Sequence, residues 1–224
     1  MVDNSVVYAK AHKKEFLQMM FSYSDKPRRK AAIFMAGTPG AGKTEMVQSL
    51  SQVFGPSYAL IDADRFRSQF RTYNGKNAED FQRGSSLLVD YTFTEVVSKG
   101  YSFILDGTFS RPKSMQNVER VLNRGYKADI YFVHQSPEDA WRFTKVRAEE
   151  EGRVVPKQAF ISSYVHAREN VHTIKERFKT QVMLNIVFKD YTNTVTDFVE
   201  DAESLEDILP PKVSEKEIEV LIND

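Results

Sequence analysis

The sequence of 224 residues contains no cysteine, so disulfide bonds and thiolate metal sites are excluded. Its four histidines (His12, His134, His166 and His172) lack the spacing of metal ligands, and a zinc site is not expected. No apolar run approaches the length of a transmembrane helix, and the first residues lack the pattern of a signal peptide. We therefore expect a cytoplasmic protein that does not enter a membrane.

The sequence also lacks an excess of charge of either sign, because Lys and Arg number 31 and Asp and Glu number 31. This balance gives no support for nucleic acid as a partner. The two ends differ, however. Residues 1–30 carry seven Lys or Arg and three acids, whereas residues 195–224 carry ten acids and two lysines. The simplest interpretation is that both ends are solvated and can lie near each other.

What the sequence does contain is a glycine-rich motif of the form G-x-x-x-x-G-K-T. An apolar run at 31–36 precedes it and a helical pattern at 45–50 follows it. Strand, glycine loop and helix together are the context of a phosphate-binding loop. The motif consists of Gly37, Thr38, Pro39, Gly40, Ala41, Gly42, Lys43 and Thr44.

Each part of the motif has a physical role at a polyphosphate. The glycines let the backbone N–H groups turn toward the phosphates, and the helix N-terminus adds positive partial charge. Lys43 would reach the β- and γ-phosphates, and the Thr44 hydroxyl would hold Mg²⁺. The alternative, a glycine-rich turn without a ligand, does not explain the flanking strand and helix. The motif therefore predicts binding of a nucleoside triphosphate, with ATP and Mg²⁺ as the cofactors.

Short apolar stretches alternate with helical patterns along the chain. This alternation predicts an α/β fold of the P-loop kinase type, a three-layer sandwich with a five-stranded, mainly parallel sheet. The expected strands are 31–36, 58–61, 101–105, 128–133 and 184–188, and the expected helices are 5–21, 43–54, 78–99, 113–123, 137–149 and 157–179. We expect residues 1–25 to form an N-terminal helix packed on the core and residues 26–200 to form the kinase domain. Residues 201–224 would form an acidic tail with one or two short helices.

Polar side chains follow two further expected strands. Asp62 and Asp64 come after the second, and Asp106, Gly107 and Thr108 come after the third. Ligands of parallel sheets bind beyond the carboxyl ends of the strands. We therefore expect these residues to share one crevice with the glycine loop.

Asp64 is the candidate general base. It lies 21 residues after Lys43 (64 − 43), where a carboxylate can accept the proton of an acceptor hydroxyl. Capping of the following helix is the alternative role for both Asp62 and Asp64, and Asp62 could also bind Mg²⁺-bound water. Asp106 could support the metal or contact the substrate. Thr108 could contact the substrate or cap a helix.

Three arginines, Arg142, Arg147 and Arg153, surround the turn between two expected helices. A mobile segment carrying arginines can close over the γ-phosphate and exclude water. Arg142 fits better as a solvated helix residue. Arg153 lies in a Gly-containing loop and is the stronger candidate for stabilising phosphate charge.

Over about residues 31–190 this constellation resembles the zeta toxin family of P-loop kinases. The similar stretches are residues 37–44, 61–64, 66–69, 106–108 and 147–159. The stretch around Arg153 is the most distinctive, because the glycine loop alone is shared by many proteins. The resemblance implies a bacterial kinase that uses ATP and Mg²⁺ to phosphorylate the 3′-hydroxyl of UDP-N-acetylglucosamine. Such toxins deplete peptidoglycan precursors and are restrained by a small antitoxin protein.

The resemblance also implies roles for individual residues. Lys43 and Thr44 match the groups that bind ATP and metal, and Asp64 matches the catalytic base. Arg147 and Arg153 match the arginines that stabilise phosphate. The residues that match the nucleotide-sugar site are Asp64, Arg67, Asp106 and Thr108.

Two positions differ from the family pattern, and both lie on the acceptor side. Asp106 stands where the family commonly has Glu, and Phe70 and Arg71 stand where it tends to have a His-Pro pair. A related kinase of another nucleotide, such as a dinucleotide cofactor, would have a similar sequence. If the protein is a toxin, the amphipathic segments 5–21 and 78–99 are possible antitoxin-docking surfaces, although core packing explains the same pattern.

Two further functions are weighed against the small-molecule kinase. A polynucleotide kinase also places Asp after its second strand, but it needs a basic groove with stacking aromatics. A nucleotide-dependent switch needs no acceptor, and it leaves Asp64 and the arginine pair unexplained. We rank the small-molecule kinase first, the polynucleotide kinase second and the switch last.

Overall fold

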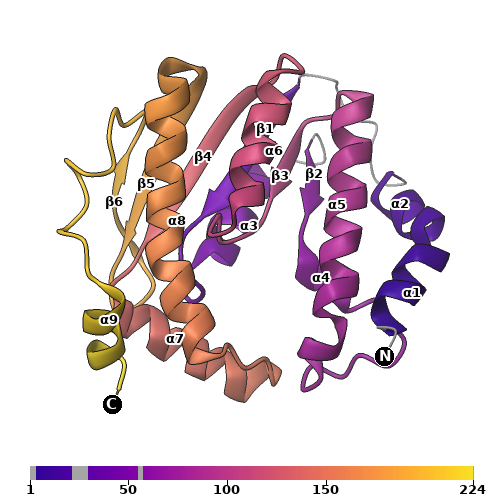
Figure 1. The fold of residues 1–224 in the computed structure, drawn as a ribbon, viewed down its shortest axis with the longest axis horizontal. Coiled ribbons are helices and arrows are strands. Elements are labelled where there is room, and N and C mark those ends of the chain that lie inside the picture. Colours follow the sequence, from indigo (N-terminus) through magenta and orange to yellow (C-terminus); the bar gives the residue numbers. More distant parts are fainter. Residues whose placement is uncertain (1–3, 22–29, 55–57, 224) are drawn as a thin grey trace.

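The computed structural model describes residues 4–21, 30–54 and 58–223. A central sheet carries helices on both faces (Figure 1), and within the described residues it has six strands in the order β2-β3-β1-β4-β5-β6. The strands are β1 (Ala31–Ala36), β2 (Ala59–Ile61), β3 (Phe103–Leu105), β4 (Lys127–His134), β5 (Val182–Lys189) and β6 (Val195–Val199). The first five pair in parallel and β6 pairs antiparallel with β5. The mainly parallel α/β class is confirmed, and the expected number of five strands was wrong.

The additional strand, β6, has a simple physical origin. It follows β5 after a short turn in which the Asn193 N–H donates to the Asp190 carbonyl over 2.9 Å. Its side chains are mostly exposed, since it lies at the sheet edge and has no helix over it. Four of the residues 195–199 are of types that favour strands, but the segment is short and lacks the continuous apolar run of the buried strands, so it was not predicted.

The helices follow the expected segments with two corrections. The helices are α1 (Asn4–Ala11), α2 (Lys13–Phe21), α3 (Lys43–Phe54), α4 (Ala63–Arg67), α5 (Gln82–Lys99), α6 (Pro112–Leu122), α7 (Pro137–Glu151), α8 (Lys157–Phe178) and α9 (Glu215–Leu221). The expected helix 5–21 is two helices that meet at His12, and the expected helix 78–99 begins with a 3₁₀ turn, η2 (Ala78–Phe81). The turn expected at 24–27 and the helix stop expected at 55–56 lie outside the described residues.

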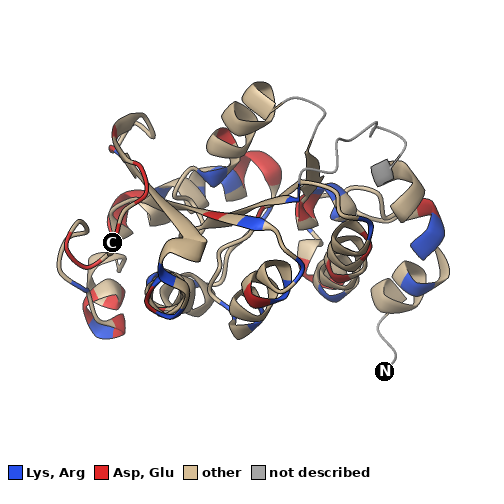
Figure 2. Ribbon diagram, turned by 90° about the horizontal axis from the view of Figure 1, so that it is seen from above, with Lys and Arg blue, Asp and Glu red and all other residues tan. Residues whose placement is uncertain are grey.

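The alternation of side chains along β1 creates two apolar cores. Ala32 and Phe34 belong to the large core beneath α5, α6 and α8, whereas Ile33 and Met35 belong to a smaller core with Val47 of α3. Successive strand residues point to opposite faces, so a fully apolar strand needs cover on both sides. Figure 2 shows these helices on the two sides of the sheet. The sandwich therefore has three layers.

The N-terminal helices α1 and α2 pack on α5. Phe16 contacts Phe66 and Phe70, with ring centroids 6.1 Å and 5.9 Å apart, and Ala9 and Leu88 are buried in the same core. The buried side chains of α1 and α2 thus pack against α5. The core accounts for these positions, and antitoxin docking on the segments 5–21 and 78–99 stays a prediction.

The acidic C-terminal segment also packs on the protein. Leu205 and Leu209 join the large core, and α9 buries Ile218 and Ile222 against Phe160 of α8. A short helix in this segment was expected and is confirmed. Helices α1 and α9 lie at opposite ends of the molecule (Figure 1), so the expectation that the two charged ends lie near each other was wrong. The division of the chain at residues 25 and 200 stays a prediction.

Candidate active site

The glycine loop joins β1 to α3 and packs closely on its neighbours. Gly40 has a φ of +79°, and a Cβ there would lie 2.0 Å from the Ala140 carbonyl oxygen of α7. Gly42 has a φ of +84°, and a Cβ there would lie 2.2 Å from the Asn193 Oδ1 atom. At Gly40 both the backbone conformation and the space therefore require glycine. At Gly42 the backbone conformation favours glycine, and the side-chain ends of Asn193 and Lys189 would have to move to admit a Cβ. The Gly37 N–H donates to the Thr108 carbonyl over 3.1 Å, which joins the loop to the segment after β3.

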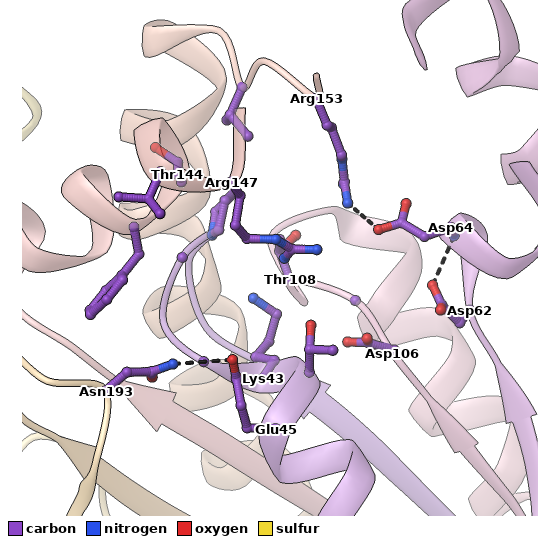
Figure 3. A pocket seen from close by; sticks show the side chains of 18 of the residues that line it. Lys43, Glu45, Asp62, Asp64, Asp106, Thr108, Thr144, Arg147, Arg153 and Asn193 are labelled. Atoms are coloured by element: carbon purple, nitrogen blue, oxygen red, sulfur yellow. Dashed lines mark hydrogen bonds and ion pairs between the residues drawn. The ribbon is translucent and has the colours of Figure 1, made fainter. Parts of the chain in front are cut away.

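A cavity of about 310 Å³ lies above the loop, at the carboxyl ends of the parallel strands (Figure 3). It brings together most of the residues predicted from the sequence. Those that line it are Pro39, Gly40, Gly42, Lys43, Thr44, Asp64, Asp106, Thr108, Arg147 and Arg153. Of the other predicted residues, Gly37 and Ala41 belong to the loop backbone, and Arg67 lines a neighbouring groove.

Lys43 occupies the centre of the cavity (Figure 3), and its Nζ donates to the Thr38 carbonyl over 2.7 Å. The pKa of Lys43 is lowered to about 8, chiefly by burial; the charge of Asp106 opposes the shift, and the charges of Arg153 and Arg147 contribute to it. The cavity wall also carries Arg147 and Arg153, together with the acids Glu45, Asp62, Asp64, Asp106 and Glu150. The three cations can pair with phosphate oxygens.

Asp62 and Asp64 have different surroundings although they are two residues apart. Asp62 is the N-cap of α4, where its carboxylate accepts from the Asp64 N–H over 2.8 Å, and burial raises its pKa. Asp64 is in the first turn, and its side chain is 40% exposed. Its Oδ1 pairs with Arg67 and its Oδ2 pairs with Arg153. Asp62 therefore supplies the helix cap, and the Asp64 carboxylate faces the cavity.

The segment after β3 brings Asp106 and Thr108 to the same cavity. The pKa of Asp106 is raised to about 6, chiefly by burial; the charge of Lys43 opposes the shift, and the carboxylates of Asp62 and Asp64 contribute to it. The Thr108 hydroxyl lies 2.6 Å from the Ser110 hydroxyl. The N-cap of α6 is Arg111, so Thr108 does not cap that helix.

The three arginines around α7 are in three environments. Arg142 pairs with Asp139 on the protein surface and donates to the Tyr191 carbonyl. Arg147 pairs with Glu151 over 3.1 Å, and its guanidinium points toward the space above Lys43 (Figure 3). Arg153 follows Gly152, which ends α7 in the left-handed conformation with a φ of +73°. Arg147 and Arg153 line the cavity, and Arg142 is outside it.

The opposite end of the cavity contains residues that sequence reasoning missed. Asn193, in the turn between β5 and β6, donates to the Glu45 carboxylate over 3.1 Å (Figure 3), and the Lys189 Nζ donates to the Asn193 Oδ1 over 2.9 Å. Phe143 of α7 lines the same end. The sequence 190–194 has the polar composition of a turn. Nothing local indicated that this turn would meet the glycine loop.

A larger groove of about 1480 Å³ adjoins the cavity and shares Asp106, Gly107, Thr108 and Arg153 with it. Its walls come from α1, α4, α5, the start of α6 and the segment before α8. Both signs of charge line it, as in Arg71, Arg83, Asp90 and Lys113. The groove therefore meets the smaller cavity beside Asp64.

A magnesium ion would fit the donor groups of the cavity only together with phosphate. Within the described ranges no group of three or more His, Asp or Glu side chains forms a metal cluster. Mg²⁺ characteristically binds phosphate oxygens and waters with one or two protein ligands. The Thr44 hydroxyl, at the start of α3 and on the cavity wall, meets that requirement.

A parallel sheet with a glycine loop after the central strand β1, and with acids after β3 beside it and after β2 at the sheet edge, defines a protein with the P-loop kinase fold. The sequence profile of the zeta toxin family matches residues 13–201, which is most of the chain. The chain belongs to the zeta toxin family.

Individual relatives agree with this assignment. Toxin PezT of Streptococcus pneumoniae serotype 4 is 26% identical over 160 residues, 65% of this chain and 63% of that protein's length. Toxin zeta of Streptococcus agalactiae is 23% identical over 209 residues, 84% of this chain and 72% of that protein. In a solved structure from the PezAT toxin–antitoxin system of Streptococcus pneumoniae, the matching chain has a TM-score of 0.70 at 21% identity. That match covers 99% of this chain and 93% of the other.

A second solved structure, of an AvrRxo1-ORF1:-ORF2 complex with ATP, has a TM-score of 0.63 at 15% identity. The match covers 88% of this chain and 64% of the other. At such low identity, both structural matches bear on the fold alone.

Proposed function

We propose that the protein is an ATP-dependent kinase that phosphorylates a sugar hydroxyl of a nucleotide sugar and acts as the toxin of a toxin–antitoxin system. The 3′-hydroxyl of UDP-N-acetylglucosamine is the first candidate acceptor. Family membership supports the reaction class. The two departures from the family pattern, at Asp106 and at Phe70-Arg71, both concern the acceptor.

One observation carries the kinase proposal: Asp64 lines the triphosphate cavity next to the larger groove. Its neighbour Ala63 and its ion-pair partner Arg153 line both the cavity and the groove. A kinase needs a base between donor and acceptor, within reach of both. A nucleotide switch has no need for a carboxylate at this junction or for an adjoining groove of this size.

The chain's own residues account for the steps of the transfer. The loop amides and Lys43 would bind the phosphates of ATP, and Asp64 would orient the acceptor hydroxyl and take its proton. Arg147 and Arg153 would neutralise charge on the phosphoryl group in transit. Mg²⁺, held by Thr44 and the phosphates, would supply further positive charge when bound. Asp106 and Thr108 are proposed to bind the nucleotide sugar at the groove side, whereas the buried Arg67 side chain pairs with Asp64 and Gln82.

The mixed charges of the groove favour a small acceptor over a polynucleotide. Arg71 and Arg83 could pair with a diphosphate, whereas Glu79 and Asp80 would repel a continuous nucleic-acid backbone. Lys113 already pairs with Asp90. Figure 2 shows Lys and Arg interspersed with Asp and Glu across the described part of the molecule. Kinases of a dinucleotide cofactor or of a polynucleotide end remain the alternatives to test.

The direct test is a mass-spectrometric search for the gain of one phosphate. Purified protein would be incubated with ATP, Mg²⁺ and a panel of nucleotide sugars, dinucleotide cofactors and oligonucleotides. We expect phosphorylated UDP-N-acetylglucosamine, and we expect Asp64→Ala not to form it. Arg65→Met, a surface change on the same helix, is the matched control. A product from another panel member would change the acceptor, and ATP hydrolysis without any product would favour the switch.

The toxin proposal needs a separate experiment. The relatives named as toxins, and the PezAT toxin–antitoxin system, support a partner protein that restrains this chain. We expect expression of the wild-type chain alone to arrest bacterial growth and Lys43→Ala to remove the arrest. Normal growth with active wild-type enzyme would contradict toxicity and leave the kinase proposal intact.

A further inference from the structure

The two oxygens of the Asp64 carboxylate pair with two arginines of different character. Oδ1 pairs with Arg67, whose side chain is 2% exposed, and Oδ2 pairs with Arg153, whose side chain is 33% exposed. Arg67 comes from the same short helix as Asp64. Arg153 comes from the segment between α7 and α8, 89 positions away in the sequence. This asymmetry suggests different functions for the two oxygens.

Arg67 is held in place at both ends of its guanidinium. One nitrogen pairs with Asp64, and the Nη2 atom donates to the Gln82 Oε1 over 2.7 Å. Gln82 begins α5, against which α4 packs. A buried guanidinium without its carboxylate would be an uncompensated buried charge, which is costly. The pair between Arg67 and Oδ1 should therefore persist through the reaction.

Arg153 has an alternative partner. It lines the triphosphate cavity, and its charge lowers the pKa of Lys43, so it lies within electrostatic reach of the phosphate-binding lysine. A γ-phosphate carries more negative charge than a carboxylate and offers bidentate geometry to an arginine. Bound ATP can therefore compete with Asp64 for Arg153. No such competitor reaches the buried Arg67.

We infer that Arg67, anchored by Gln82, is a positioning residue that holds Oδ1 of Asp64. Oδ2 is then the oxygen that accepts the proton. Arg153 leaves Oδ2 and binds the triphosphate before phosphoryl transfer. This inference rests on the proposed kinase function. It assigns Arg67 an action through Asp64, in place of the contact with substrate predicted from the sequence. It also makes ATP binding the event that frees the base.

The resulting step balances as follows. The oxygen of the acceptor hydroxyl forms a bond to the γ-phosphorus as the bond between that phosphorus and the β,γ-bridging oxygen breaks. The hydroxyl proton moves to Oδ2 of Asp64, while Oδ1 keeps its bond to Arg67. ADP leaves with the bridging oxygen. Before ATP binds, Oδ2 is occupied by Arg153, so the base is masked.

The role of Arg67 is tested by its dependence on Asp64. With ATP and UDP-N-acetylglucosamine as probes, Arg67→Lys should lower kcat about 10- to 100-fold and change either KM less than about threefold. Arg65→Lys on the same helix is the matched control and should change neither. In an Asp64→Asn background, Arg67→Lys should lower the residual rate by less than about twofold, because its effect passes through the carboxylate. An equal loss in both backgrounds would overturn the positioning role and leave only a structural one.

The release of Arg153 is tested without any acceptor. Affinity for the non-hydrolysable analogue β,γ-imido-ATP with Mg²⁺ would be measured by calorimetry for wild type, Asp64→Asn, Arg153→Met and the double variant. Asp64→Asn should tighten binding about three- to tenfold when Arg153 is present, since it removes the competing partner. In the Arg153→Met background it should tighten binding less than about twofold. This small tightening is expected because Asp64→Asn removes one negative charge that repels the triphosphate.

The outcomes separate the inference from the proposed function. Equal tightening in both backgrounds would overturn the release of Arg153 while leaving ATP binding established. No nucleotide binding by any of the four proteins would overturn the proposed function and the inference with it. Nucleotide binding without phosphorylation of UDP-N-acetylglucosamine would show that the acceptor is another molecule. The calorimetric comparison would still decide whether Arg153 leaves Asp64 when the nucleotide binds.

Discussion

The donor cavity and the acceptor groove are built in different ways. The phosphate-binding part of the cavity is one continuous segment, residues 39–45, in which Gly40 leaves no room for a side chain. The remaining walls come from the start of α4, the segment after β3, α7 with the segment after it, and the turn before β6. The groove is formed by side chains from α1, α4, α5, α6 and the segment before α8. Backbone amides bind any triphosphate in the same way, because substitutions leave the amides in place. The side chains that line the groove can be replaced one at a time, and each replacement alters the contacts with the acceptor. The donor should therefore be common to the fold, and the acceptor should vary.

At Asp64, where the cavity and the groove adjoin, both backbone and side-chain contacts set the geometry. Asp64 has its backbone position set by the N-cap Asp62, and its carboxylate is set by arginines from two separate elements. Substitutions on the donor side should affect ATP binding, and substitutions at the junction should affect the rate. The following predictions test that separation, from the largest expected effect to the smallest.

Lys43→Ala should have the largest effect because it removes the charge at the centre of the cavity. We expect turnover to fall by at least about 10³-fold and ATP affinity to fall by at least about tenfold. Steady-state kinetics and calorimetry measure the two quantities. Unchanged ATP affinity would mean that the triphosphate binds elsewhere.

Asp64→Ala should remove most of the rate and leave ATP bound. A general base contributes typically about 10²- to 10⁴-fold, so kcat should fall within that range. ATP affinity should stay equal or become slightly tighter, because Arg153 loses a competing partner. Near-normal transfer by this variant would show that another group accepts the proton.

Arg153→Ala should lower kcat about 10- to 100-fold, more than it raises the KM for ATP, because its full contact forms only as charge develops on the transferred phosphoryl group. Arg142→Ala is the matched control, since Arg142 lies on the same helix–loop segment but outside the cavity. An effect of Arg153→Ala confined to KM would make Arg153 a binding group alone.

Gly40→Ala should weaken ATP binding by about tenfold or more while sparing the groove. The new Cβ would meet the Ala140 carbonyl at 2.0 Å, so the loop must move. Gly125→Ala is the control, because Gly125 has a similar φ of +73° but no atom within 4 Å of the added Cβ. The control should cost about 1 kcal/mol of stability and leave ATP affinity unchanged. Equal ATP affinity in the two variants would contradict the tight packing of the loop.

The titration of His134 should have the smallest effect, and that effect is on the free energy of unfolding. Burial, with the charge of Arg168 nearby, lowers the pKa of His134 from its ordinary 6.5 to about 4. Between these values the unfolded chain binds more protons than the folded protein, so stability is full above pH 6.5 and falls as the pH approaches 4. The loss is up to about 3 kcal/mol. Urea denaturation across this range should show a shallower decline for His134→Gln, and an identical decline would contradict the assignment.

Much of the donor side could be predicted from sequence because its signals are local. Apolar runs indicated the five parallel strands, and the glycine motif with its flanking strand and helix located the phosphate-binding loop. Strand ends of a parallel sheet lie on one edge, so Asp64, Asp106 and the loop could be brought together without coordinates. The edge strand β6 was missed because it is short and lacks the continuous apolar run of the buried strands.

The sequence by itself thus determined the family, the α/β class and the location of the phosphate-binding loop, since each depends on neighbouring residues. Only the tertiary structure decided the partners of individual side chains: Arg67 and Arg153 on the two oxygens of Asp64, and Asn193 on Glu45 beside the loop. These contacts join segments far apart in the chain, or depend on which face of a short helix is buried. Their energies come from packing and desolvation, which local sequence patterns do not encode.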